Sequence, residues 1–118
     1  MNERPYQKLI VWKEAHSLCL QVYAITKSFP SDEKFALTKQ MQRASYSVPM
    51  NIAEGNAKHS KKDHAHFLEI ANGSLDELHY QCILAHDLGY LATDSLEKIN
   101  DSIQRVGFLL HKLRSSLL

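Results

Sequence analysis

The chain has 118 residues, which suits one domain with one hydrophobic core and is too short for two. Four glycines and three prolines are too few for the turns of a β-sandwich or barrel, and no apolar run is long enough to span a membrane. The formal net charge of +1 does not by itself indicate nucleic-acid binding. The first residues lack the order of a secretory signal, so we expect a cytoplasmic single-domain protein, residues 1–118, with no membrane partner.

The charges are distributed unevenly along the chain. Residues 31–62 hold six bases and three acids, whereas residues 63–101 hold one base and eight acids. Two interpretations stay open. The helices have solvated faces of mixed sign, or a basic face lies beside an acidic one, which favours head-to-tail subunit contacts or a local anion site.

The first predicted helix covers about residues 10–29. Its apolar residues recur at steps of four and three, the spacing of one helix face. The residues on this face are Val11, Ala15, Leu18, Val22, Ile25 and Phe29. Pro30 should end the helix, because proline restricts the residue before it and has no backbone N–H to donate. Cys19, like Cys82 later in the chain, lies in an apolar helical pattern and is predicted to be a buried thiol.

The second predicted helix begins near Ser31. This serine is a suitable N-cap, and Asp32 and Glu33 would be favoured in the positive first turn. Pro49 lies inside the helical pattern, where it removes one backbone bond, so we expect a kink or a break there. Residues 54–56 suit a left-handed C-cap.

The third predicted helix begins at Ser60 and closes at Gly89. Asp63 follows the serine by three residues, a variant of the capping box. Gly73 lies in the middle of this helix, where glycine costs on the order of 1 kcal/mol relative to alanine. A glycine at such a position indicates that a neighbouring backbone comes close.

The fourth predicted helix follows a cap at Thr93 and Asp94 and has the cleanest periodicity in the chain. Seven apolar residues step by three and four, giving three heptads of core positions. They are Leu96, Ile99, Ile103, Val106, Leu110, Leu113 and Leu117. Of these, Ile103, Val106 and Leu110 are predicted to be buried.

Phe108 and Leu109 lie beside this seam and are candidates to face another subunit. Four amphipathic helices with short connections predict an all-α fold, an antiparallel up-and-down four-helix bundle with its second helix kinked at Pro49.

Seven histidines raise the question of a metal site. Di-iron bundles use Glu-x-x-His pairs on two helices, and this chain has none. The nearest patterns are Asp63-x-x-His66 and Asp76-x-x-His79, both on the third helix. Phosphate-binding glycine loops, nucleophile elbows and Cys-x-x-Cys pairs are also missing from the sequence. We therefore expect no catalytic, cofactor-binding or metal-binding residues and no enzymatic activity.

Basic residues gather around the start of the third helix. His59, His64 and His66 lie among Lys58, Lys61 and Lys62. An anion-binding helix end and an exposed, solvated cap both fit this composition. The candidate nucleic-acid-binding residues are Lys39, Arg43, Lys58, Lys61, Lys62 and Arg105.

Four polar residues share one stripe of the second helix around Pro49. They are Arg43, Ser47, Asn51 and Glu54, spaced by four, four and three. Proline at position 49 leaves a carbonyl near Ser45 without its helical donor, and a nearby polar side chain could satisfy it. Structural bonding is the first explanation for the stripe, and a recognition surface is the second.

The segment that carries this stripe resembles a known family signature. Residues 43–55 read Arg-Ala-Ser-Tyr-Ser-Val-Pro-Met-Asn-Ile-Ala-Glu-Gly. They are similar to the pattern Arg-Ala-x-x-Ser-(Ile/Val)-Pro-x-Asn-Ile-Ala-Glu-Gly of the four-helix bundle family named for proteins encoded in 23S rRNA intervening sequences. Shorter matches are the segments 9–12, 67–68, 73–75 and 77–78. The residues matched to the family motif are Arg43, Ser47, Pro49, Asn51, Glu54, Gly55, Gly73 and Ser74.

The resemblance implies a short up-and-down bundle that assembles as a pentameric barrel. It also implies similarity to the accessory protein of diversity-generating retroelements, a basic pentamer that binds a reverse transcriptase and nucleic acid. The leading hypothesis is a non-catalytic homopentamer that serves as an assembly or scaffold module for RNA or an RNA-linked protein. The alternative is an accessory protein that binds nucleic acid directly through its basic surface. A metal-dependent enzyme is the third.

Overall fold

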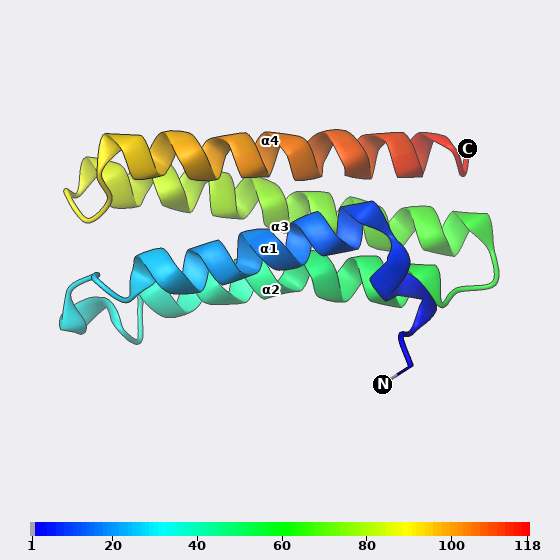
Figure 1. The fold of residues 1–118 in the computed structure, drawn as a ribbon, viewed down its shortest axis with the longest axis horizontal. Helices are drawn as coiled ribbons and strands as arrows, with labels where there is room; N and C mark the ends of the chain where they lie inside the picture. The colour runs from blue at the N-terminus through cyan, green and yellow to red at the C-terminus, as the bar shows by residue number, and fades with distance from the viewer. Residues whose placement is uncertain (1) are drawn as a thin grey trace.

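The computed structural model describes residues 2–118, which form an all-α bundle without strands. The four helices are α1 (Ile10–Thr26), α2 (Leu37–Asn56), α3 (Lys61–Asp87) and α4 (Thr93–Ser115). Two 3₁₀ turns, η1 (Pro5–Lys8) and η2 (Ser31–Glu33), precede α1 and α2. Figure 1 shows the four helices side by side, with each helix running opposite to the one before it. The predicted antiparallel four-helix bundle is confirmed.

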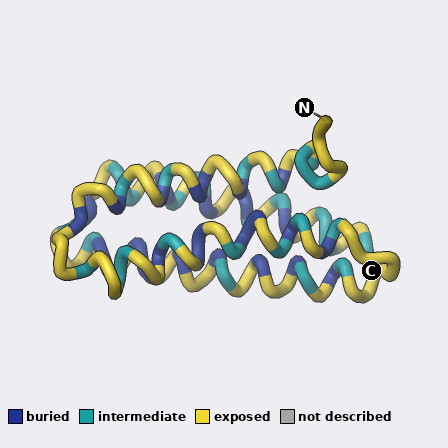
Figure 2. Tube along the Cα trace, turned by 90° about the horizontal axis from the view of Figure 1, so that it is seen from below, coloured by how far each residue is buried: buried dark blue, intermediate teal, exposed yellow. Residues whose placement is uncertain are grey.

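The helices form a closed ring in chain order around one core. α1 packs against α2 and α4, and α3 packs against the same two helices. Figure 2 shows the buried positions on the inward sides of the helices, with exposed positions on the outside. The bundle measures 44 by 30 by 21 Å, with its longest dimension along the helices.

The seam of α4 lies where its periodicity places it. Ile99, Ile103, Val106 and Leu110 are all buried in the core cluster. The prediction for Ile103, Val106 and Leu110 is therefore confirmed. Leu96, Leu113 and Leu117, near the two ends of the helix, are half-buried and pack against the same core.

The two extra apolar residues of α4 have different positions. Leu109 is half-buried and packs against the core of its own chain, so its apolar side chain is used within the bundle. Phe108 is 60% exposed, with the Nζ of Lys112 lying 5.6 Å from the centre of its ring.

The predicted start of the second helix at Ser31 is wrong. α2 begins at Leu37, and Ser31 opens the separate turn η2, where it makes no side-chain cap bond. The Oε1 of Glu33 accepts from the backbone N–H of Leu37 at 3.3 Å, and its Oε2 accepts from the hydroxyl of Tyr90 at 2.9 Å. Glu33 thus joins this turn to the loop between α3 and α4. A contact across 57 residues overrides the local capping signal.

The first helix ends at Thr26 rather than near Phe29. The hydroxyl of Thr26 donates to the carbonyl oxygen of Val22 at 2.9 Å. Phe29 follows outside the helix, remains buried and packs against Tyr90 with ring centres 5.6 Å apart. The apolar pattern therefore extends beyond the end of the helix, because Phe29 reaches the core from the loop.

The glycines at positions 55 and 73 have roles opposite to those predicted. Gly55 is not a left-handed cap, because Gly89, with φ of 83°, is the only positive-φ residue in the described chain. Gly55 is buried inside α2, where a Cβ would lie 3.0 Å from the Cβ of Phe67 and 3.2 Å from the carbonyl oxygen of His64. Gly73 is exposed, and a Cβ there would meet nothing within 4 Å. The close approach that was predicted at Gly73 occurs at Gly55. Gly89 ends α3 as predicted.

Pro49 lies inside α2 without dividing it, so the predicted break does not occur. The ring is buried on the side that faces α1. Burial of the proline offsets part of the cost of its missing N–H, because its apolar ring packs between the two helices.

Candidate functional site

Three motif residues form a polar link between α2 and α3. The hydroxyl oxygens of Ser47 and Ser74 lie 2.8 Å apart. The side-chain amide of Asn51 donates to the backbone carbonyl of Ser47 at 2.8 Å and to its hydroxyl oxygen at 3.1 Å. All three residues are half-buried. This link explains why a serine pair and an asparagine stand at these positions.

Asn51 does not serve the carbonyl that was predicted to need a donor. Its amide bonds to Ser47, whereas the expected acceptor was the carbonyl of Ser45. Ser45 is itself buried, and its hydroxyl donates to the carbonyl of Gln42 at 2.7 Å and contacts the Sγ of Cys19 at 3.4 Å. Structural bonding therefore accounts for part of the stripe, through a different acceptor.

Arg43 and Glu54 do not take part in this bonding. Both are exposed, and none of the ion pairs found among residues 2–118 includes either of them. They are eleven residues apart on α2, about three turns, so they point to the same side roughly 16 Å from one another. Because the fold does not use them, they are the motif residues with the best claim to a recognition role.

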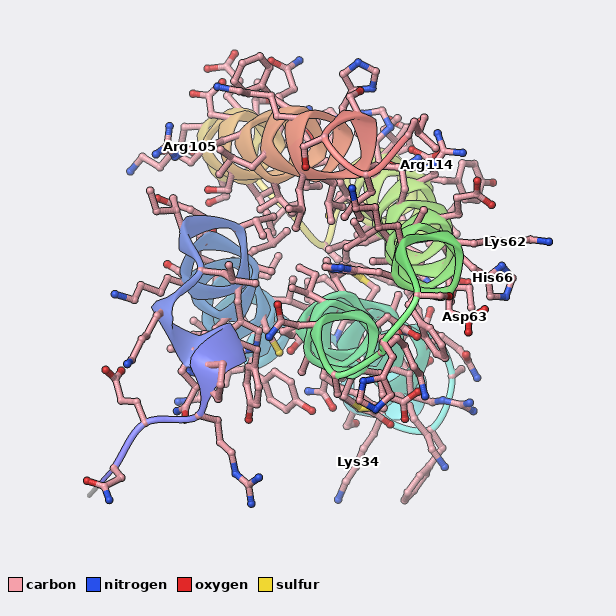
Figure 3. The ribbon with its side chains drawn as sticks, turned by 90° about the vertical axis from the view of Figure 1, so that its right-hand side faces the viewer. Lys34, Lys62, Asp63, His66, Arg105 and Arg114 are labelled. Atoms are coloured by element: carbon pink, nitrogen blue, oxygen red, sulfur yellow. The ribbon has the colours of Figure 1, made fainter. Side chains whose placement is uncertain are left out.

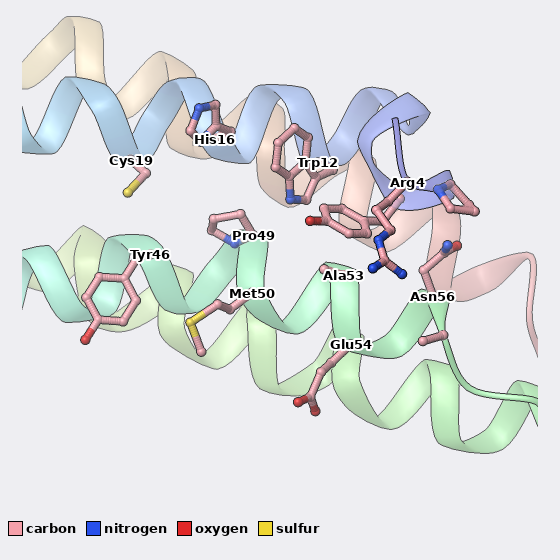
Figure 4. A pocket seen from close by; sticks show the side chains of 13 residues that line it. Arg4, Trp12, His16, Cys19, Tyr46, Pro49, Met50, Ala53, Glu54 and Asn56 are labelled. Carbon is pink, nitrogen blue, oxygen red and sulfur yellow. The ribbon is translucent and has the colours of Figure 1, made fainter. Parts of the chain in front are cut away.

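An apolar groove of about 830 Å³ lies between α1, α2 and η1. Its lining residues are Arg4, Pro5, Tyr6, Trp12, His16, Cys19, Tyr46, Pro49, Met50, Ala53, Glu54, Asn56 and Ala57. Figure 4 shows Pro49 of α2 pointing toward α1, which carries Trp12 and His16, while Met50 extends from α2 on the side away from α1 and Arg4 comes from the N-terminal segment. Local sequence patterns do not predict the groove, because three separate elements form it.

Aromatic contacts hold one wall of the groove in place. The rings of Trp12 and His16 are stacked with centres 5.1 Å apart, and Tyr6 meets Trp12 edge-on at 5.3 Å. Offset-stacked and edge-on pairs are favourable ring arrangements. The turn η1 brings Tyr6 to this position. Contacts within the chain therefore hold one wall of the groove in place.

Large apolar side chains are exposed along the same two helices. On α1 and α2 they are Ile10, Leu20, Tyr23, Tyr46 and Met50. Met50, at 58% exposed, also lines the groove. Tyr46 lines it too, whereas Ile10 lies at a separate hollow beside Leu109 and Leu113 of α4. Exposed apolar side chains in a groove are typical of a site for another molecule.

The two cysteines are buried and free, as predicted. Burial raises the pKa of the Cys82 thiol to about 12, so this thiol stays protonated at neutral pH. Cys19 lies beside the groove, next to the hydroxyl of Ser45.

The six candidate nucleic-acid-binding residues do not share one surface. Arg105 belongs to α4, where its Nε lies 3.0 Å from the Oε1 of Glu14. Figure 3 shows Arg105 and Lys62 pointing away from the bundle in different directions. Lys58 has its Nζ 5.0 Å from the ring centre of Phe67. Lys39 and Arg43 are exposed on α2, and Lys61 and Lys62 are exposed at the start of α3.

The histidines near the start of α3 do not converge. His64 is half-buried against Gly55, and burial lowers its pKa. His66 points outward from α3 beside Lys62 (Figure 3), and His59 is exposed before the helix. The hydroxyl of Ser60 accepts from the backbone N–H of Asp63 at 3.0 Å, so this serine is the predicted N-cap.

Residues 2–118 contain no group of three or more histidines, cysteines or acids placed to hold a metal ion. Asp63-x-x-His66 and Asp76-x-x-His79 therefore lack a third ligand in this range. No helix within it has both the length and the apolar character needed to cross a membrane.

Comparison with known proteins supports the fold and the family. A protein of unknown function from the S23 ribosomal protein family of Bacteroides thetaiotaomicron has a similar crystal structure, with a TM-score of 0.83 at 23% identity. The match covers 90% of this chain and 96% of that one. No curated protein matches the chain. The family model described as 23S rRNA-intervening sequence protein matches residues 7–112, the range that holds the motif and the polar link, and the chain belongs to this family.

Proposed function

We propose that the protein is a non-catalytic homo-oligomeric module that assembles through the face formed by α1 and α2. The observation that supports this proposal is the groove of about 830 Å³, whose lining includes the exposed side chains of Tyr46 and Met50. Monomeric proteins seldom leave large contiguous apolar patches in water, and a patch next to a groove favours association. Burying a side chain such as Met50 contributes about 1.5–3 kcal/mol.

A pentamer is the oligomer that the family resemblance favours. Copies joined head to tail close into a ring when the rotation between neighbours allows it. Such contacts need two different surfaces on each copy. The uneven charge distribution, basic in residues 31–62 and acidic in residues 63–101, suits this kind of contact.

The assembled protein would act as a scaffold for RNA or an RNA-linked protein. The family name refers to 23S rRNA intervening sequences, and this supports the link to RNA. A ring also brings together several copies of the lysines at the start of α3, so a small basic cluster gains from multivalency.

Sedimentation velocity and light scattering test the assembly. We expect a species of about five times 13.5 kDa at micromolar concentration. A single species at 13.5 kDa would refute the proposal. Another ring size would preserve the assembly and exclude the pentamer.

Direct nucleic-acid binding is the second candidate. Lys58, Lys61 and Lys62 lie within five residues beside the start of α3, and this is the observation in its favour. Phosphate contacts release counterions, so affinity for structured RNA should fall steeply as salt is raised. Replacing the three lysines by glutamine should weaken binding, whereas Arg105→Gln should change it little. No binding at low salt would exclude this function.

A further inference from the structure

We propose that the groove between α1 and α2 of one copy receives the outer stripe of α3 from a second copy, with Arg43 opposite Glu77 and Glu54 opposite His66. This inference rests on the proposed homo-oligomer, because it names the two surfaces that would join. The outer stripe of α3 is defined as His66, Ile70, Gly73, Glu77 and Tyr80.

The stripe runs straight along the outside of α3. Its residues are spaced by four, three, four and three, and all five are exposed. Ile70 and Tyr80 are large apolar residues that are 40% and 61% exposed. In Figure 3, His66 points away from the bundle on the side of α3 opposite to α1. The stripe and the groove are therefore on different sides of one copy, as head-to-tail contacts require.

Gly73 lies in the middle of the stripe and has no function within its own chain. A side chain there would meet nothing within 4 Å, and the glycine has no positive φ that would favour it. Glycine is a poor helix former, so an exposed helical position without such needs is better occupied by another residue. A second helix lying across this position provides a reason, because glycine lets two backbones approach closely.

Contacts within one copy set the level of each residue along the bundle. Ser47 of α2 bonds to Ser74 of α3, and Gly55 lies against Phe67. Since the two helices are antiparallel, each step up α2 matches one step back along α3. Arg43 therefore lies within one or two residues of the level of Glu77, and Glu54 within one or two residues of the level of His66, a difference of about 1.5–3 Å along the helix.

These levels carry over to a second copy in a ring. When the ring axis is parallel to the helices, neighbouring copies lie at the same height. Groups of complementary charge then lie opposite each other at both ends of the stripe. Arg43 meets an acid and Glu54 meets a histidine, with Lys62 one turn away. Met50 meets Ile70 and Gly73 in the apolar middle.

The exposed face of α4 offers a weaker match. Its large exposed side chain, Phe108, already lies under the ammonium group of Lys112 in its own chain. Arg105 is already paired with Glu14. Other charges of α4, among them Lys98 and Asp101, are exposed, but Phe108 is the one large apolar side chain exposed on the described length of this helix.

Charge reversal tests the contact. Arg43→Glu and Glu77→Arg should each weaken self-association at least tenfold in sedimentation equilibrium at low salt. The double variant that combines Arg43→Glu with Glu77→Arg should associate again, because the reversed charges are opposite once more at every contact of the ring. Lys98→Glu and Asp101→Arg on the exposed side of α4 are the matched controls and should associate like the wild type.

Each result decides between the two proposals. A monomeric wild type refutes the proposed homo-oligomer. A wild type that assembles, with Arg43→Glu and Glu77→Arg indistinguishable from their controls, leaves the oligomer standing and overturns this contact. A double variant that associates no better than the two single variants overturns the pairing of Arg43 with Glu77.

Gly73→Leu tests the close approach independently of charge. In the separated monomer it should raise the melting temperature, because leucine is the better helix former and meets no neighbour. In the assembly it should weaken association at least tenfold, because the side chain occupies the contact. Gln104→Leu, at an exposed position of α4, is the control and should leave association unchanged. Wild-type association of Gly73→Leu would overturn the proposed docking of α3.

Discussion

α4 and α2 are both long helices of the same bundle, yet their sequences carry different information. The buried residues of α4 follow one regular seam, and its outer face is largely polar. α2 buries a proline and a glycine, bonds to α3 through Ser47 and exposes Met50 beside a groove. A helix that only covers the core can follow a simple repeat. α2 lies against α1 and α3 and also lines the groove. Each of these contacts requires a specific residue, so its sequence does not follow a simple repeat.

The largest expected effect is in the seam of α4. Leu110→Ala should lower the free energy of unfolding by about 2–4 kcal/mol, because the side chain is fully buried and its loss leaves a cavity. Phe108→Ala, two positions away but exposed, should change it by less than about 1 kcal/mol. Urea denaturation monitored by circular dichroism measures both. Equal losses of stability in the two variants would contradict the burial of Leu110 and the exposure of Phe108.

Gly55→Ala tests the close packing of α2 against α3. An added Cβ would lie 3.0 Å from the Cβ of Phe67, so α2 and α3 must shift apart. We expect a loss of about 1–3 kcal/mol, the usual cost of overpacking. Gly107→Ala is the matched control in α4, where the nearest atom is the flexible Cδ2 of Leu75 at 3.4 Å. A stabilised Gly55→Ala would contradict the close approach of α2 and α3.

The polar link between α2 and α3 should have a smaller effect. Ser74→Ala removes the hydroxyl that lies 2.8 Å from that of Ser47. The expected loss is about 0.5–1.5 kcal/mol, typical of one hydrogen bond. Ser102→Ala on α4 loses only a long bond of 3.5 Å to the carbonyl of Lys98 and should be near neutral. If the two variants lose the same amount, the link has no special role in joining the helices.

The smallest expected effect is the pH dependence due to His64. Burial lowers the pKa of this histidine in the folded protein, so the unfolded chain binds the proton more readily. Its contribution to stability should be fully present above the unfolded pKa of about 6.5 and should be lost as pH falls towards the lower folded pKa. Urea denaturation from pH 7.5 to 5 should show this slope, and His64→Gln should reduce it. The exposed His111→Gln is the control. An unchanged slope in His64→Gln would assign the dependence to other groups.

Much of the architecture follows from local patterns in the sequence. The four amphipathic repeats, the cap at Ser60, the stop at Gly89 and the two buried thiols depend on residues within a few turns of one another. The site was harder to foresee. Ser47, Asn51 and Ser74 all belong to the motif, but the bond between Ser47 and Ser74 joins two helices and cannot be read from one of them. The groove likewise needs η1 folded against α1.

Tertiary contacts decided the features that local signals misplaced. The bond from Tyr90 to Glu33 holds the turn that replaces the predicted start of α2. Gly55 and Gly73 are the same residue type within helices, and the sequence does not distinguish them. Only the distance to the next helix shows that a side chain would be crowded at Gly55 and would have open space at Gly73. Periodicity determines which face of a helix is apolar. The distance between two helices depends on every side chain packed between them, so it cannot be predicted from the apolar repeat of one helix.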